Sequence, residues 1–134
     1  MRLISLQKQF GLDQLEAVRA RAPIETLEGP FDEGPDAFAD TAAVVANLDL
    51  VITIDTSMGH LAGALGRPVW VLLPRSSDWR WLTNREDNPW YPTLRLFQQT
   101  VSDDWTSVAA RVRDRLAAVR SGQSPVIWPV GSSN

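Results

Sequence analysis

The stretch from Ile54 to His60, which reads Ile-Asp-Thr-Ser-Met-Gly-His, holds the side chains best placed to do chemistry. Asp55 follows an apolar run that predicts a strand, and Thr56 and Ser57 supply hydroxyls that could cap a following helix. The start of a helix carries unpaired N–H groups and a partial positive charge, and both favour a phosphate. The turn is therefore a candidate anion-binding site.

His60 and the glycines around it sharpen this hypothesis. His60 lies in the expected first helical turn, where the helix dipole disfavours a cation, so a neutral imidazole is expected until a diphosphate binds. Gly59 leaves backbone N–H groups open to a ligand, and glycine inside a helix costs up to about 1 kcal/mol relative to alanine. Gly59 and Gly63 therefore indicate a close approach, to a strand or to a ligand.

Simpler interpretations of the same residues stay open. Asp55 can be a helix cap, His60 a satisfied surface or core histidine, and Gly59 and Gly63 can serve packing alone. The usual phosphate-loop patterns, GxGxxG and GxxxxGK[ST], are absent from the sequence.

The elements that must position this turn alternate between strand and helix. Apolar, β-branched runs predict strands at 2–6, 24–27, 50–54, 69–73 and 94–97, with the strand at 50–54 buried on both faces. Helices are expected at about 12–22, where Pro23 ends the first one, and at 41–48, 57–65 and 103–120, with a short one at 78–82. This order predicts an α/β fold, Rossmann-like, with a parallel sheet and helices on both faces.

Two helix starts and one helix face can be assigned in more detail. Asp40 or Thr41 is expected to cap the second helix, and Ser102 or Asp103 the last one. The last helix should bury an apolar stripe made of Trp105, Val108, Val112, Leu116 and Val119.

Ligands of such sheets bind beyond the carboxyl ends of the strands. The rule points to Gln7-Lys8, to the loop before Thr41, to the turn at 55–60 and to residues 74–81.

Composition limits the classes of protein. The 134 residues suit one domain, expected at 1–122, followed by a tail at 123–134. The absence of cysteine excludes disulfides, thiolate metal sites and cysteine nucleophiles, and one histidine cannot build a zinc site alone. The net charge of −3 and the lack of a basic patch disfavour nucleic-acid binding. No apolar run is long enough for a transmembrane segment or a secretory signal, so a cytoplasmic location is expected.

Residues 55–68, which read DTSMGHLAGALGRP, resemble the D-T-x-x-x-H-L-A-x-A-L-G-[KR]-P segment of heptosyltransferase-like glycosyltransferases, the ADP-heptose:lipopolysaccharide type. Nearly all of residues 2–120 also resemble the C-terminal domain of bacterial tetratricopeptide-repeat proteins that end in such a domain. The stretches that carry this second resemblance are 5–8 (SLQK), 38–43 (FADTAA), 78–81 (DWRW), 85–87 (RED) and 89–92 (PWYP).

The resemblance implies the second Rossmann-like half of a GT-B fold, which binds the nucleotide-sugar donor of an inverting, metal-independent glycosyltransferase. Asp55 then matches an acid that contacts the donor sugar, and Thr56, Ser57 and Met58 match residues whose amides hold the diphosphate. Gly59 and His60 lie beside it. Lys8 corresponds to a basic residue near the phosphates, and the loop before Asp40 and Thr41 approaches the nucleoside.

The resemblance also implies what the chain lacks. The acceptor site and catalytic base of the family belong to an N-terminal domain, so no catalytic residue, metal or cofactor is expected here. The chain is expected to be a fragment whose partner is the missing N-terminal glycosyltransferase or repeat domain. A homodimer across the lost interface is a further expectation.

Two other classes of function stay open. A non-catalytic scaffold would act through protein contacts made by exposed aromatic residues, although the same residues could simply pack a long loop. A nucleotide-sugar epimerase of related fold would need further carboxylates and histidines, and the sequence has only His60. The exposed aromatic contacts of such a scaffold would be Trp79, Trp81, Trp90 and Tyr91, and the residues that could serve either an interface or a donor loop are Trp79, Arg80 and Trp81.

Overall fold

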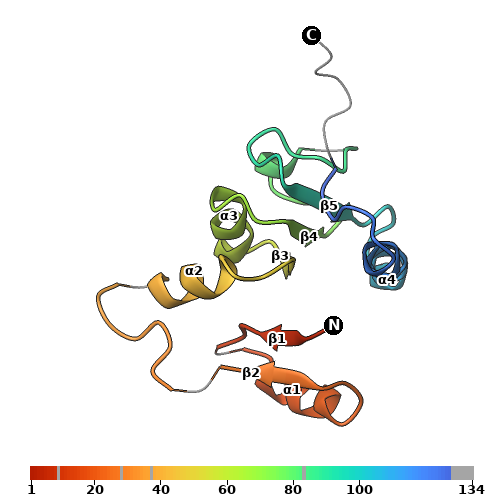
Figure 1. The fold of residues 1–134 in the computed structure, drawn as a ribbon. Helices are drawn as coiled ribbons and strands as arrows, with labels where there is room; N and C mark the ends of the chain where they lie inside the picture. The colour runs from red at the N-terminus through yellow and green to blue at the C-terminus, as the bar shows by residue number, and fades with distance from the viewer. Residues whose placement is uncertain (9, 28, 37, 83, 128–134) are drawn as a thin grey trace. The chain divides into compact units, whose positions relative to one another are not determined.

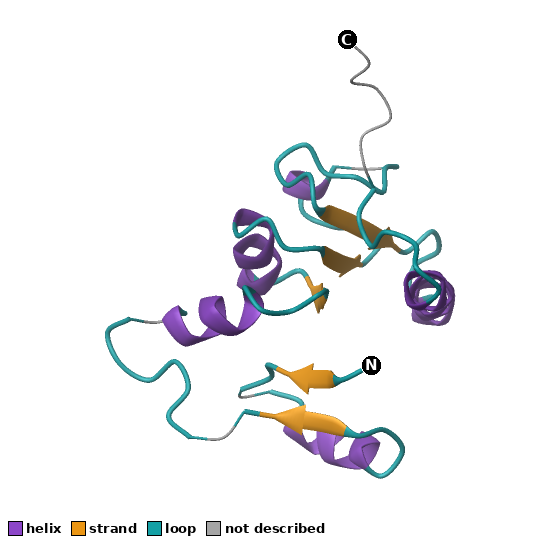
Figure 2. Cartoon of the chain, viewed as in Figure 1, coloured by secondary structure: helices purple, strands orange, loops and turns teal. Residues whose placement is uncertain are grey.

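Strands and helices alternate along the chain, which was analysed as a computed structural model (Figures 1 and 2). The structure describes residues 1–8, 10–27, 29–36, 38–82 and 84–127. These residues form two compact units, Met1–Ala43 and Val44–Asn134. The predicted α/β class with parallel sheets flanked by helices is confirmed.

The first unit is a β-α-β arrangement. Strand β1 (Leu3–Ser5) leads to helix α1 (Leu12–Arg19) and then to strand β2 (Ile24–Thr26). The two strands pair in parallel, with Leu3 opposite Ile24. Both strands lie within a residue of their predicted bounds, whereas α1 ends at Arg19, earlier than the predicted end at Pro23. Helix α2 (Ala39–Val45) then crosses the boundary between the two units.

The second unit is built on a three-stranded parallel sheet in the order β3-β4-β5. Its strands are β3 (Val51–Ile54), β4 (Val69–Leu73) and β5 (Leu94–Gln98). Helix α3 (Ser57–Ala64) connects β3 to β4, a short 3₁₀ helix η1 (Trp79–Trp81) follows β4, and helix α4 (Trp105–Arg120) follows β5. The carboxyl ends of all three strands therefore lie at one edge of the sheet.

Helices cover both faces of this sheet. A Cβ atom added to Gly59 of α3 would lie 3.3 Å from Val71, which places α3 on the face to which Val71 points. Trp70 points to the opposite face, because neighbouring strand residues alternate. There Trp70 and Phe97 form a buried cluster with Val108 of α4. The other residues that pack against this cluster include Val112, Leu116 and Val119, as the predicted stripe required.

Several local predictions were wrong. Strand β3 is not buried on both faces, because it is an edge strand of its sheet and exposes Ile52 and Ile54. Trp105 is exposed rather than part of the buried stripe, because α4 begins at this residue. The cap of α4 is Asp104, one residue after the predicted Asp103.

The segment after α4 packs against the second unit rather than leaving it at once. The indole Nε1 of Trp70 donates to the carbonyl of Pro125 at 2.9 Å, and Arg115 donates to Gln123 and Ser124. The rest of the predicted tail, residues 128–134, lies outside the described part of the chain.

Among the described residues, no helix has both the length and the apolar character needed to cross a bilayer.

Candidate functional site

The turn from Asp55 to His60 lies where the chain leaves the carboxyl end of β3 and enters α3. Thr56 is the N-cap of α3 and has an extended backbone, with φ −143° and ψ 170°. Contrary to prediction, neither hydroxyl caps the helix, because Thr56 makes no side-chain cap and Ser57 is already the first helical residue. The Oγ1 atom of Thr56 lies instead 3.2 Å from Oγ1 of Thr53.

Because no side chain caps α3, backbone N–H groups at its start are left without a hydrogen-bond acceptor. The amide of Gly59 donates to the carbonyl of Thr56 at 3.1 Å. In the described part of the chain, the amides of Ser57 and Met58 have no hydrogen-bond acceptor. Asp55, Thr56 and Ser57 are exposed and Met58 is half-buried. The turn therefore offers two free N–H groups at the positive end of an eight-residue helix.

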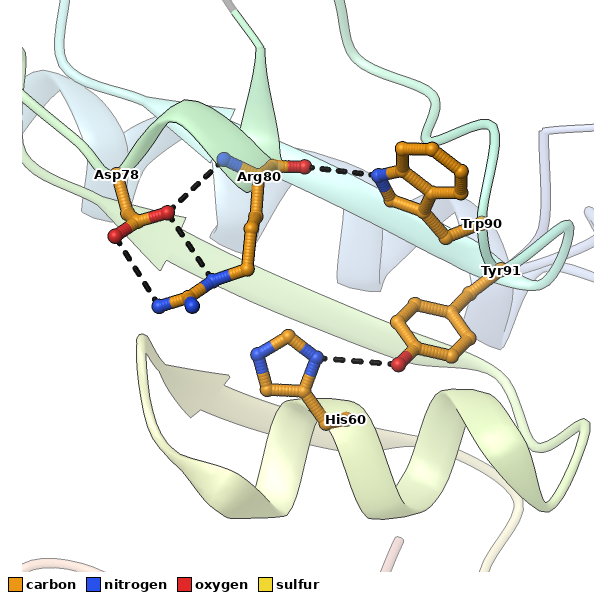
Figure 3. A network of polar contacts seen from close by, with 5 residues as sticks. All are labelled: His60, Asp78, Arg80, Trp90 and Tyr91. Atoms are coloured by element: carbon orange, nitrogen blue, oxygen red, sulfur yellow. Dashed lines mark hydrogen bonds and ion pairs between the residues drawn. The ribbon is translucent and has the colours of Figure 1, made fainter.

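His60, in the fourth position of α3, is held by two aromatic residues (Figure 3). Its Nδ1 atom lies 3.2 Å from the hydroxyl of Tyr91. Its ring stacks on Trp81, with centroids 4.8 Å apart and an interplanar angle of 21°. Among the described residues Nε2 has no hydrogen-bond partner, and Figure 3 shows it on the side of the ring away from Tyr91.

The long loop between β4 and β5 delivers both aromatic partners. The side-chain oxygen of Asn88 accepts from the amides of Trp90 at 2.9 Å and Tyr91 at 3.2 Å, which shapes the turn before Tyr91. Asp78 starts the 3₁₀ helix by accepting from the amide of Arg80 at 3.0 Å. The loop is thereby folded back over α3, so that His60 meets residues that follow it by 21 and 31 positions in the sequence.

The two glycines of α3 serve this packing. A Cβ atom on Gly59 would lie 3.3 Å from Val71 and 3.5 Å from Thr53. A Cβ atom on Gly63 would lie 2.6 Å from the Cγ atom of Tyr91. The close approach predicted from these glycines is therefore to the sheet and to Tyr91, which is the packing interpretation.

The aromatic residues of the loop divide into buried and exposed members. Trp81 is only 1% exposed, so its prediction as an exposed contact residue was wrong, because it is covered by the stack on His60. Tyr91 is half-buried. Trp79 is 73% exposed and Trp90 61%. The carbonyl of Arg80 accepts from the indole of Trp90 at 3.3 Å, as Figure 3 shows.

The three site residues predicted in the first unit gather around a residue that sequence reasoning missed, Asp32. Lys8 donates to the Asp32 carbonyl at 3.2 Å, and the Asp32 amide donates to the carboxylate of Asp40 at 2.9 Å. The Thr41 amide donates to the Asp32 carboxylate at 3.1 Å, and the Thr41 hydroxyl bonds to it as well. The prediction that Asp40 or Thr41 caps α2 was thus wrong, since α2 begins at Ala39 and Asp32 binds the Thr41 amide.

Hydrogen bonds set the charge state of Asp32. Desolvation acts to raise the pKa of its carboxyl, but hydrogen bonds from Thr41 outweigh it and hold that pKa below its ordinary value. Residues 28–35 are rich in Gly, Pro and acidic residues, which is typical of a loop, and nothing in that sequence singles out Asp32 among the acids.

Comparison with known proteins adds an independent observation. The family model of glycosyltransferase family 9 (heptosyltransferase) matches residues 34–99. A curated relative, Protein FlbA of Caulobacter vibrioides (strain ATCC 19089 / CIP 103742 / CB 15), is 39% identical over 87 residues. That match covers 63% of this chain and 14% of the relative, so the chain spans a small part of that protein. No solved structure matches.

The matched stretch contains all of β3, the turn, α3 and the loop that carries Trp81 and Tyr91. Residues 34–99 therefore have the sequence pattern of glycosyltransferase family 9, and the turn from Asp55 to His60 lies inside it.

Proposed function

We propose that this chain is the nucleotide-sugar-binding part of a metal-independent, inverting glycosyltransferase, and that the turn from Asp55 to His60 holds the donor diphosphate. The observation that carries the proposal is the pair of free amides, Ser57 and Met58, at the start of α3 within the stretch that matches family 9. A diphosphate accepts hydrogen bonds from such amides and is favoured by the helix dipole.

The side chains around these amides have complementary roles in the proposal. Asp55 is exposed at the end of β3 and contacts hydroxyls of the donor sugar. His60 uses Nδ1 to hold Tyr91 and keeps Nε2 for a phosphate oxygen. Stabilisation of the leaving nucleoside diphosphate then needs no metal, because preorganised N–H groups supply it.

The remaining parts of the reaction belong elsewhere in the proposal. The acceptor site and the catalytic base lie in a further domain of a longer protein, linked to tetratricopeptide repeats. The small share of the curated relative that this chain covers supports that view. Lys8, Asp40 and Thr41 meet around Asp32 within the first unit, and their part in nucleotide binding stays a prediction.

A titration of the ¹⁵N-labelled chain tests the diphosphate site. UDP, GDP and ADP, each added to millimolar concentration, are expected to shift the backbone amide signals of residues 56–60, with saturation for the preferred base. Absence of any shift with all three nucleotides would contradict the proposal.

Ser57→Pro removes one of the proposed donors with little cost to the helix. Proline suits the first helical position, and the extended backbone of Thr56 suits a residue before proline. The dissociation constant of the preferred nucleotide is expected to rise about tenfold, as for loss of one hydrogen bond to a charged group. Ser57→Ala keeps the amide and should bind as the unaltered chain does. Equal affinity of both variants for the nucleotide would show that the Ser57 amide is not part of the site.

A second candidate function rests on the exposed indoles of Trp79 and Trp90. Exposed aromatic side chains favour a protein contact, as in a scaffold domain without catalysis. That alternative predicts that the nucleotides leave residues 56–60 unshifted. It also predicts that Trp79→Ser weakens capture of the partner domain.

A further inference from the structure

A second polar site lies at the same edge of the sheet, beyond the carboxyl ends of β4 and β5. It is a pocket of about 630 Å³, within the range of small-molecule sites. Arg75 follows β4, Gln99 follows β5 and Arg111 projects from α4, and all three line it. None of the residues 55–60 lines it, so it is distinct from the proposed diphosphate site.

The charges that line the pocket are unbalanced. Three arginines face one glutamate, Glu86. Glu86 is already paired with Arg95 at 2.6 Å, and the lining Arg85 is paired with Asp87 at 2.6 Å. In the described part of the chain, Arg75 and Arg111 have no carboxylate within ion-pair distance. Two guanidinium groups therefore face the pocket without a direct counter-ion.

Backbone carbonyls hold these two guanidinium groups in place. Arg75 donates from one terminal nitrogen to the carbonyl of Thr100 at 2.7 Å, and Arg111 donates to the carbonyl of Gln98. Each guanidinium group uses some of its five N–H donors in this way, and the remaining N–H groups can donate to an anion.

The side chain of Gln99 also lines the pocket, and it carries a buried N–H donor without a hydrogen-bond acceptor. The residue is only 5% exposed, and its side-chain oxygen accepts from the amide of Arg75 at 3.2 Å. Its Nε2 group is buried without a hydrogen-bond partner. A buried N–H group left unpaired is costly. Because this one has almost no accessible surface, a ligand in the pocket would not reach it directly. The anion site therefore rests on the two arginines, of which Arg111 also interacts electrostatically with Asp104.

We propose that this pocket binds a small molecule through an anionic group, a carboxylate or a phosphate, held by Arg75 and Arg111. Guanidinium groups bind both kinds of anion through paired hydrogen bonds. The inference stands on these contacts alone and does not depend on the proposed donor site.

Titration of the ¹⁵N-labelled full chain with inorganic phosphate, and separately with sodium acetate, at constant ionic strength tests the site. The side-chain amide signal of Gln99 and the Nε–H signals of Arg75 and Arg111 are expected to shift and saturate with at least one of the two. The probe whose titration saturates shows whether the site binds a phosphate or a carboxylate. Saturation with neither probe would overturn the proposal.

Two arginine variants on the same helix distinguish binding in the pocket from a general effect of surface charge. Arg111→Met is expected to raise the dissociation constant about tenfold, as for loss of a charged hydrogen-bond partner. Arg113→Met is the control, since Arg113 lies on the same helix, is 76% exposed and is paired with Asp114. An equal effect of both variants would contradict the proposal. If Arg111→Met does not fold, as judged by amide dispersion, Arg75→Met gives the same comparison.

The same spectra keep this proposal apart from the proposed function. Shifts confined to the backbone amides of residues 56–60 would support the diphosphate site and overturn the pocket. Shifts confined to Gln99 and its arginines would support the pocket alone.

Discussion

At the scale of single residues, His60 shows how one side chain can serve structure and ligand binding together. Its ring stacks on Trp81 and its Nδ1 atom is engaged by Tyr91, so its orientation is set before any ligand arrives. The interpretation as a satisfied histidine and the interpretation as a ligand-binding one are therefore compatible. The first describes Nδ1, and the second is the proposal for Nε2.

Gly63 offers a residue-scale prediction because its Cβ position is occupied by Tyr91. Gly63→Ala places a methyl group 2.6 Å from the Cγ atom at the root of the ring, where the side chain cannot easily move aside. We expect the free energy of unfolding to fall by about 1–3 kcal/mol, as for overpacking, less the gain of up to about 1 kcal/mol that alanine brings to a helix. Urea denaturation measures it.

Gly59→Ala is the matched control, because its nearest contact, Val71, would be 3.3 Å away and needs to move only slightly. The loss for Gly59→Ala is expected to be the smaller of the two. A Gly63→Ala variant as stable as the unaltered chain would show that Tyr91 does not pack here as described.

At the scale of elements, helix starts are decided by single hydrogen bonds. Asp104 caps α4 by accepting from the amide of Ser107 at 3.0 Å, and the Ser107 hydroxyl donates to the Asp104 carbonyl. Asp103, the residue predicted to cap, instead adopts φ 64°, the left-handed conformation. The chain turns at Asp103 so that the next carboxylate reaches the helix, and a sequence with two adjacent aspartates does not reveal this choice.

The cap of α4 leads to a prediction about pH. Hydrogen bonds from Ser107 hold the pKa of Asp104 below its ordinary value. Because the folded pKa lies below that of the unfolded chain, about 3.9, the carboxylate stabilises the fold fully above the unfolded value. This contribution is lost as the pH falls through the folded pKa.

Thermal unfolding of Asp104→Asn between pH 7 and pH 2 checks this expectation. Asparagine keeps a capping oxygen at every pH. The unaltered chain should have the higher Tm near neutral pH, by a few degrees, and the difference should shrink towards zero in acid. Asp103→Asn, which removes the neighbouring charge but no cap, should show no such convergence. A difference in Tm that stays constant with pH would count against the ionised cap.

At the scale of the whole molecule, the chain combines a β-α-β unit with a three-stranded unit that carries the turn and the arginine pocket. Its match to the curated relative covers 14% of the length of that protein. In the proposed function, it binds the donor while the acceptor and the base come from the rest of a longer protein.

The expected consequence is binding without transfer. The chain alone, incubated with UDP-, GDP- and ADP-sugars, should release no nucleoside diphosphate above the uncatalysed rate. The parallel titration of the same sample should still shift residues 56–60. Release of nucleoside diphosphate by the chain alone, detected by chromatography and lost in Ser57→Pro, would place the catalytic groups in this chain and refute the assignment to another domain.

The sequence by itself determined the order of elements and the position of the turn. Strand β4 falls at the predicted residues 69–73, and the stripe of Val108, Val112, Leu116 and Val119 lies in the core as expected. These features are readable because apolar periodicity and glycine or proline at element ends act over a few neighbouring residues.

Only the tertiary structure decided which distant residues meet. His60 with Trp81 and Tyr91, Lys8 with Asp32, and Gln99 with Arg75 and Arg111 come from separate elements. The exposure of Ile52 and Ile54 likewise depends on the place of β3 at the edge of its sheet. Such contacts depend on how elements pack, and a local pattern of residue types carries no information about a partner many residues away.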